Sequence, residues 1–262
     1  MRVKIACAIL LLLTVGGISS TRPARAVAPP LALDGVGTNT CQAMFCVQSQ
    51  LLTTTKGHDV VILIVECGAG SPCGNVSKVS DSSGLTFIQR TSYIASDLSG
   101  TNFWEYYAIA TSPLHSDNIT VVTDTCNAPV YCIEGMQVLA IHGANTQAVF
   151  DPNPSIPATV SCAYLVNPDL IGYIDPCSTS IQTSTTDFLL AATGINDAGP
   201  CGRGYPHGVV PGFTNIVNQN NRFEVDYAIT TTPQTNVTFS CNGTDAVAIV
   251  VDAISFRGAF GI

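Results

Sequence analysis

Short apolar runs alternate along the chain with clusters of Gly, Pro, Asn, Asp and Ser, and no long segment has the 3.6-residue spacing of an amphipathic helix. This pattern predicts β-strands in two sets. The first set is 44–53, 58–66, 84–91, 102–111, 117–124 and 132–142; the second is 178–183, 187–195, 212–218, 222–231, 235–241 and 245–257. The segment 144–177 between the sets contains five prolines, so we expect a connection with little strand content.

Short sequence matches occur in the same order in the two sets. The number of residues between the two members of each match decreases along the chain. The matched stretches are 59–63 with 187–191, 72–74 with 200–202, 107–109 with 227–229, 118–120 with 236–238, and 140–141 with 253–254. Repeated order of this kind predicts one structural unit used twice. We expect one β-sandwich domain over 27–262, with a first half at 31–143, the Pro-rich connection at 144–177 and a second half at 178–262.

Three stretches of the first half carry a resemblance to a known group of proteins. The apolar run 59–66, the hairpin VSDSSGLT at 79–86 and the aromatic strand 103–110 resemble secreted bacterial and archaeal jelly-roll-like β-sandwich modules of cell surfaces. The resemblance extends over about residues 31–257 and implies an extracellular module without catalytic residues. The expected fold class is therefore all-β: a jelly-roll-like, disulfide-bonded β-sandwich of two related halves.

The first 26 residues have the pattern of a secretory signal. Arg2 and Lys4 precede an apolar run at 5–15, and Ala24-Arg25-Ala26 provides a small-x-small cleavage site. The apolar run is too short to cross ~30 Å of hydrocarbon as a helix. We expect export, cleavage after Ala26 and a secreted product that does not span a membrane.

Cysteine usage agrees with an oxidising compartment. Cys7 leaves with the signal, and an even number remains: Cys41, Cys46, Cys67, Cys73, Cys126, Cys132, Cys162, Cys177, Cys201 and Cys241. No C-x-x-C or zinc-type histidine spacing accompanies them, so we expect no metal site of that kind.

The internal repeat makes the expected pairing specific. Cys73 corresponds to Cys201, and Cys126 lies close to the counterpart of Cys241, which predicts a Cys201–Cys241 bond. Cys162–Cys177 would close the connection, and Cys41–Cys46 would follow by elimination. Cys67, Cys73, Cys126 and Cys132 are expected to pair among themselves, with the pairing left open.

The charge balance excludes some partners. Loss of the four basic residues in 1–26 leaves six Lys and Arg against 18 Asp and Glu, a formal net charge of −12. Nucleic acid and anionic lipid both need cationic partners, so we expect neither. Charged residues make up only 11% of the chain, and such a surface is poorly protected against association. Self-association or N-glycans would cover it, and the sequons begin at Asn75, Asn118, Asn236 and Asn242.

The strand 102–111 carries the candidate chemistry. Glu105 shares the apolar face of the strand, where the second copy has Val225, and jelly-roll glycosidases place carboxylates on such a face. The alternatives are a structurally paired or a solvated carboxylate. Trp104 and Tyr106 are expected on the opposite, outward face, where flat aromatics stack on sugars, form a subunit interface or lie under a loop.

Other ligand and catalytic signals are weaker. Alternate oxygen-bearing residues over 97–102 leave structural calcium open, although the glycine and glutamate of an EF-hand are missing. No G-x-S-x-G or phosphate-binding loop is present, and we expect no catalytic residue and no other cofactor.

The sequence thus favours a non-enzymatic extracellular or cell-surface structural protein, such as a self-assembling filament, lattice or adhesion subunit. The second hypothesis is a module that binds surface glycans through Trp104 and Tyr106. The third is a glycoside hydrolase that acts through Glu105.

Overall fold

A computed structural model describes residues 30–37, 49–67, 75–94, 101–123, 135–167, 170–196, 199–219 and 222–258, apart from the side chains of residues 218 and 219. The fold is all-β, as expected, and the helical content of these residues is one 3-10 turn, η1 (Pro206–Gly208). Within the described ranges, no helix is long and apolar enough to cross a membrane.

The first half forms a five-stranded antiparallel sheet and a three-stranded outer sheet. The five-stranded sheet has the order β1 (Ala32–Val36), β8 (Gly135–His142), β3 (Asp59–Cys67), β6 (Asn102–Ala110), β5 (Ile88–Ile94). The outer sheet has the order β2 (Ser49–Leu52), β7 (Asp117–Thr123), β4 (Val76–Ser80).

The second half has a corresponding arrangement. Its five-stranded sheet has the order β9 (Ala158–Ser161), β17 (Ala246–Ser255), β13 (Asp187–Ile195), β15 (Phe223–Ile229), β14 (Thr214–Gln219). Its outer sheet pairs β12 (Cys177–Ile181) with β16 (Val237–Cys241), and β10 (Ala163–Asn167) and β11 (Leu170–Tyr173) form a separate hairpin.

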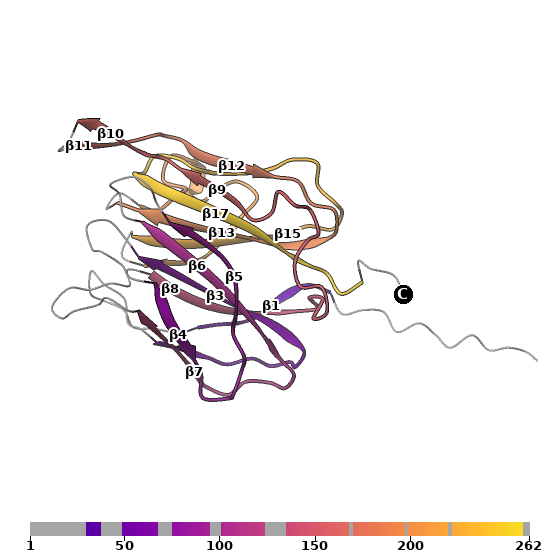
Figure 1. The fold of residues 1–262 in the computed structure, drawn as a ribbon. Coiled ribbons are helices and arrows are strands. Elements are labelled where there is room, and N and C mark those ends of the chain that lie inside the picture. The colour runs from indigo at the N-terminus through magenta and orange to yellow at the C-terminus, as the bar shows by residue number, and fades with distance from the viewer. Residues whose placement is uncertain are drawn as a thin grey trace, which may run out of the picture.

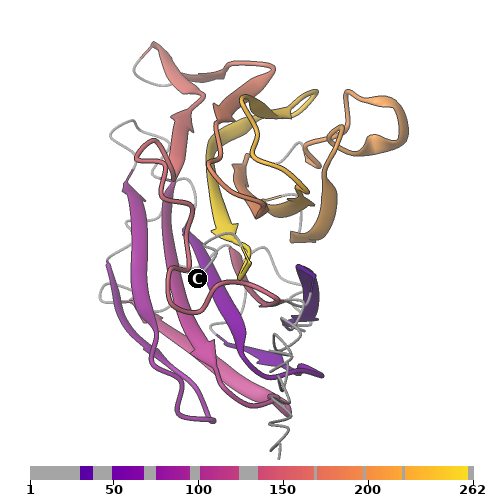
Figure 2. The same ribbon diagram turned by 90° about the vertical axis from the view of Figure 1, so that its right-hand side faces the viewer.

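The two halves have the same strand order once β1, β8, β3, β6 and β5 are matched with β9, β17, β13, β15 and β14. The outer pair β2–β7 likewise matches β12–β16, and β4 has no counterpart among the described strands. Most consecutive strands of the first half alternate between its two sheets, as in a jelly roll, whereas β5–β6 and β14–β15 are hairpins within the five-stranded sheets. The four sheets stack as layers, with the five-stranded sheets facing each other in the middle (Figures 1 and 2). That the halves arose by duplication stays a prediction.

Stacking of this kind buries both faces of the two five-stranded sheets. Val60, Ile62 and Ile64 of β3 enter the central core between the halves, while Val61 and Leu63 enter the core under the first outer sheet. All nine residues of β3 are buried, and so are all nine of β13. Because both faces are covered, these strands are continuous apolar runs instead of alternating ones.

Aromatic residues from both halves fill the central core. The rings of Phe103 and Phe223 lie 6.5 Å apart across the halves, and Phe188 stacks on Tyr227 at 5.0 Å. β8 begins at Gly135, where a Cβ atom would lie 2.1 Å from Cγ of Phe223. The sheets therefore approach closely enough at this point that only glycine fits.

The expectation for the connection 144–177 is wrong. This segment contains β9, which extends the second sheet, and the hairpin β10–β11. Pro152, Pro154 and Pro157 lie before β9, and Pro176 lies after the hairpin, so these prolines flank the strands instead of excluding them. The strands β1 and β4 were also not expected.

Candidate functional site

A charged cluster joins the halves inside the central core. Nε of Arg90 on β5 donates to Oδ2 of Asp252 on β17 at 2.9 Å, and Nη2 donates to the carbonyl of Ile156 at 3.2 Å. The Arg90 guanidinium also lies 4.1 Å from the centre of the Phe150 ring. Burial, and then the charge of Asp252, hold the pKa of Glu105 well above its ordinary value. Arg90 thus forms an ion pair with Asp252 of the second half, and its charge also acts on Glu105 of the first half.

The expected position of Glu105 on the core face is confirmed, since its residue is 4% exposed. The cavity beside it measures about 10 Å³, room for one water molecule at most. A sugar cannot reach this carboxyl in the folded chain. The geometry fits a structural contact between the halves, and nothing in it favours the glycoside hydrolase hypothesis.

The expectation that Trp104 and Tyr106 face outward is wrong. Their exposed fractions are 3% and 8%, and they pack under the outer sheet in a core with Leu52 and Val121. The alternation along β6 was assigned correctly, but the opposite face of the sheet is covered by a further layer. These aromatic rings therefore offer no platform for sugars.

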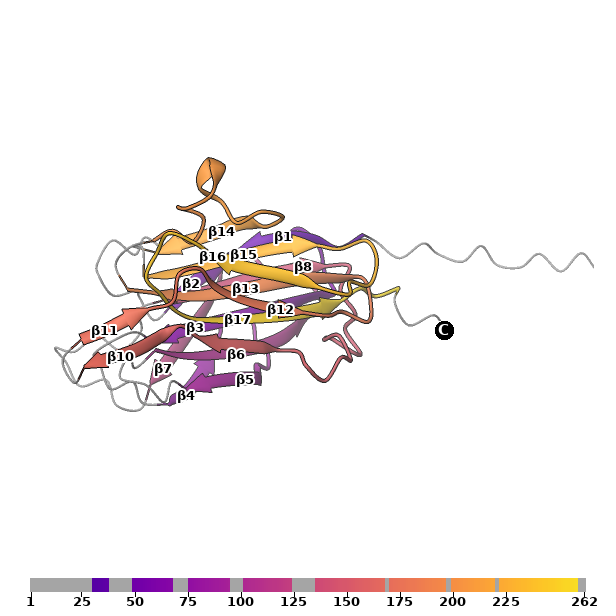
Figure 3. The ribbon, with the colours of Figure 1, turned by 90° about the horizontal axis from the view of Figure 1, so that it is seen from above.

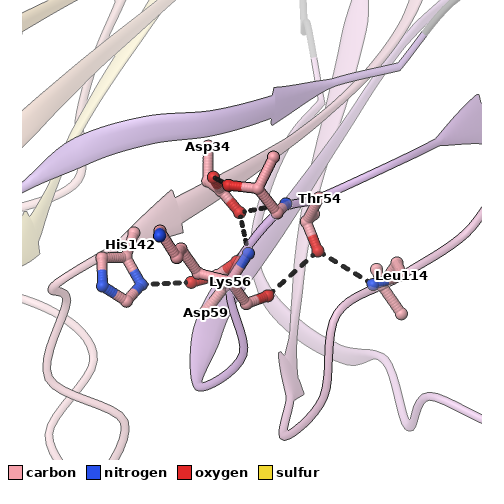
Figure 4. Close-up of polar contacts among 7 residues, drawn as sticks. Asp34, Thr54, Lys56, Asp59, Leu114 and His142 are labelled. Carbon is pink, nitrogen blue, oxygen red and sulfur yellow. Dashed lines mark hydrogen bonds and ion pairs between the residues drawn. The ribbon is translucent and has the colours of Figure 1, made fainter.

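The half-buried Asp34 and the buried Asp59 form hydrogen bonds at the end of the first sheet where β3 begins (Figure 4). Asp34 accepts hydrogen bonds from the backbone N–H groups of Thr55 and Lys56, both at 2.8 Å. Nδ1 of His142 lies 2.8 Å from Oδ1 of Asp59. Burial raises the pKa of Asp59, and the hydrogen bond to His142 opposes that shift.

The second half repeats this network with different residues. Asp151 accepts from the backbone N–H groups of Ser184 and Thr185 at 2.7 and 2.9 Å, as Asp34 does in the first half. The hydroxyl of Thr185 donates to Asp187, the counterpart of Asp59, at 2.6 Å, and lies 3.3 Å from the hydroxyl of Ser255. Ser255 stands where the first half has His142. Because the network persists without an imidazole, we assign it a structural role in both halves.

A second acidic pair lies in the outer core of the second half. Glu224 and Asp226 occupy the positions that correspond to Trp104 and Tyr106. Oε2 of Glu224 accepts the backbone N–H of Cys201 at 2.8 Å. Burial, and then the charge of Glu224, raise the pKa of Asp226 to about 8, so Asp226 retains its proton at neutral pH.

Among the described residues, no group of three or more His, Cys, Asp or Glu side chains is placed to hold a metal ion. The calcium prediction at 97–102 falls mainly on residues 97–100, which lie outside the described residues. So do the expected signal 1–26 and the cysteines at 41, 46, 73, 126 and 132.

Two of the expected disulfides are present. Cys162 is bonded to Cys177 with a Cα–Cα distance of 5.7 Å, and Cys201 to Cys241 with 4.3 Å. Cys67 is also disulfide-bonded. Bonds of this kind are typical of proteins that fold in an oxidising compartment.

The four sequon asparagines differ in access. Asn75, Asn118 and Asn236 are exposed. Asn242 is half-buried, and its side-chain amide packs against Gly204 so closely that a Cβ at position 204 would lie 2.7 Å from it. The first three positions have room for a glycan, and their use stays a prediction.

The hairpin β10–β11 projects from one end of the second half (Figures 1 and 3). Four large residues of the hairpin and Ile174, which follows it, are about half exposed: Tyr164 49%, Leu165 51%, Val166 53%, Leu170 52% and Ile174 52%. Ile171 and Tyr173 are partly buried. Because consecutive residues of a strand point to opposite faces, each face of the hairpin carries exposed apolar residues: Tyr164 and Val166 lie on one face and Leu165 on the other.

The base of the hairpin is held firmly to the second half. The Cys162–Cys177 disulfide closes it, and Ile174 N–H donates to the carbonyl of Cys162 at 2.8 Å. Nδ2 of Asn196 donates to the hydroxyl of Tyr173 at 2.6 Å. The hairpin is therefore presented in a fixed position.

Sequence reasoning missed this hairpin, although a signal was present. Residues 163–166 are an uninterrupted run of aliphatic and aromatic residues, but they lie between prolines in a segment interpreted as a connection. An apolar run is normally taken for a buried strand, and nothing in the letters shows that this one projects into solvent.

Comparison of the chain with protein-family models, with curated proteins and with solved structures gave no match. The functional assignment therefore depends on the geometry described above.

Proposed function

We propose that this chain is a non-enzymatic extracellular structural subunit that self-assembles, and that the hairpin β10–β11 is a contact through which it does so. The observation that carries the proposal is the apolar, uncovered and rigidly anchored hairpin. The expected signal and the disulfides support an extracellular setting.

An isolated two-stranded hairpin is at best marginally stable in water. β10 and β11 pair with each other alone, so each strand has one edge without a ladder partner among the described strands. Native proteins usually blunt such edges with charges or cover them. Here the described residues of both strands are uncharged and largely apolar. A partner that pairs with an open edge and covers an apolar face would both complete the backbone ladder and bury the exposed apolar residues.

A second copy of the chain fits this surface better than a membrane or a glycan does. The chain is acidic, which disfavours anionic lipid, and only 11% of its residues are charged, so uncharged surface is available for contact between copies. The glycan-binding hypothesis loses its platform because Trp104 and Tyr106 are buried.

A matched pair of substitutions tests the proposal. Val166→Lys places a charge on the hairpin, and Val122→Lys places the same charge on a comparably exposed valine of the first outer sheet. Light scattering of the exported protein from micromolar to near-millimolar concentration should show oligomers for the parent and for Val122→Lys, and monomers for Val166→Lys. Equal melting temperatures would establish that both variants are folded.

A parent that is monomeric throughout, or a Val166→Lys variant that assembles like the parent, would overturn the proposal. A parent that stays monomeric but floats with neutral phosphatidylcholine vesicles would replace self-assembly by contact with a lipid surface.

A further inference from the structure

Each half has a stretch of strand edge that its own sheet leaves open. β5 begins at Ile88, which pairs with Tyr107, so β6 continues past it without a partner on that side over residues 108–110. A groove of about 470 Å³ runs along this open edge, from the turn at 83–86 to Pro113. We call it the β6 groove.

The second half has a corresponding groove. β14 begins at Thr214, which pairs with Tyr227, and residues 228 and 229 of β15 have no ladder partner on that side. The groove beside them measures about 330 Å³, and we call it the β15 groove. Gly84 and Gly212 occupy corresponding turns at φ of 82° and 81°, and these turns precede the two incoming strands.

The open edges and the hairpin match in charge. The lining of the β6 groove contains Ser, Gly, Leu, Thr, Ile, Tyr, Ala and Pro but no ionisable acid or base other than the tyrosine. The described residues of the hairpin strands are likewise free of acidic and basic side chains. An acidic chain can therefore bring these two surfaces together without charge repulsion between them.

The hairpin and the grooves lie at opposite ends of the sheets. Cys162 at the base of the hairpin donates its N–H to the carbonyl of Val247, near the start of β17. The grooves lie at the other end, where β17 finishes. There the carbonyl of Ser255, the last residue of β17, accepts a hydrogen bond from the backbone N–H of Asn145, which lies just after β8. Figure 3 shows the hairpin projecting away from the arrowhead of β17. Eight residue steps along β13 separate the ends by roughly 26 Å, so a hairpin does not reach the groove of its own chain.

We propose that the β10–β11 hairpin of one copy adds a strand to the open edge of β6 in a second copy, in line with β5. This inference rests on the proposed function and specifies its contact. The β6 groove is the larger of the two. The β15 groove is lined by Val237 and Thr238, so a glycan on the exposed Asn236 of that sequon would stand at its rim.

This pairing joins two different surfaces, and such contacts repeat from copy to copy without closing unless the rotation happens to form a ring. Main-chain hydrogen bonds would supply affinity, and the apolar side chains of the hairpin would supply the fit to the groove. The expected assembly is a head-to-tail filament.

Cysteine cross-linking between two differently substituted copies tests the contact. One preparation carries Leu165→Cys or Val166→Cys, so that one of the two thiols faces the groove side. The other carries Thr111→Cys in the β6 groove or, as the matched control, Thr231→Cys in the β15 groove; both threonines are exposed and occupy corresponding positions. The preparations are mixed, oxidised mildly and mapped by mass spectrometry.

We expect hairpin-to-Thr111→Cys dimers and only background levels with Thr231→Cys. Cross-links to Thr231→Cys instead would overturn the choice of groove. Absence of cross-links to both, while Val166→Lys still abolishes assembly, would overturn the strand-addition contact and leave the proposed function standing.

Discussion

The two halves of the molecule have the same strand order, but the outer faces of their five-stranded sheets are covered differently. The first half covers Trp104 and Tyr106 with a three-stranded sheet. The second half has two strands there, and the segment 199–213 closes the gap through the Cys201–Cys241 disulfide. The central-core faces of β6 and β15 share Phe103 with Phe223 and Tyr107 with Tyr227 but differ at Glu105 and Val225. The outer faces carry Trp104 and Tyr106 in the first half and Glu224 and Asp226 in the second.

The halves also differ in what they present to solvent. The hairpin β10–β11 belongs to the second half, and the strand order of the first half has no counterpart for it among the described strands. The second half would act as the donor in assembly, and the larger open groove of the first half would act as the acceptor.

The largest effect should come from the disulfide that replaces the missing outer strand. Cys201 and Cys241 are 40 residues apart. In the chain-entropy model, the double variant Cys201→Ala/Cys241→Ala therefore loses roughly 4 kcal/mol of unfolding free energy. Denaturant unfolding measures this, with Cys162→Ala/Cys177→Ala as the comparison, because the shorter loop of that bond predicts about 3 kcal/mol. An equal loss, or a larger one for the hairpin disulfide, would contradict the assigned role.

The next largest effect concerns a buried carboxyl in the central core, which should be tolerated in the first half but not in the second. Val225→Glu places a carboxyl at the site that corresponds to Glu105 but without Arg90 beside it, and we expect a loss of about 3 kcal/mol or more. Glu105→Val should stay within about 1 kcal/mol of the parent, because an apolar residue replaces a buried acid while Arg90 keeps Asp252. Urea unfolding at neutral pH compares the two. Similar losses for both variants would show that the two sites are not distinguished by their charges.

A smaller effect concerns pH and the second outer core. The pKa of Asp226 is about 8 in the folded chain against 3.8 ordinarily. The folded state therefore binds the proton more tightly, and the stability that this contributes is complete at low pH and declines as pH rises from about 4 towards 8. Asp226→Asn removes this decline, so its stability relative to the parent should improve by about 2–3 kcal/mol between pH 5 and 7. Melting curves across this range decide the matter: a constant difference would mean that Asp226 titrates normally.

Much of the framework was predictable from sequence for identifiable reasons. β13 was expected at 187–195 and is found there, because turn residues bound an apolar run that is buried on both faces. The Cys201–Cys241 bond followed from positions matched across the repeat. Trp104 and Tyr106 were misplaced because alternation along a strand tells which residues share a face but not how many layers cover it. The hairpin was missed because its apolar run lies between prolines and has the composition of a buried strand.

Hydrogen exchange at several protein concentrations tests the central claim, that the hairpin β10–β11 makes this chain associate, most directly. The unmodified exported protein is followed amide by amide from dilute to concentrated solution. We predict that amides of the hairpin, and of β6 beside its open edge, exchange quickly when the protein is dilute and become protected as concentration rises. Amides of β13 should be protected throughout. Exchange in the hairpin that does not change with concentration, while light scattering shows assembly, would contradict the claim.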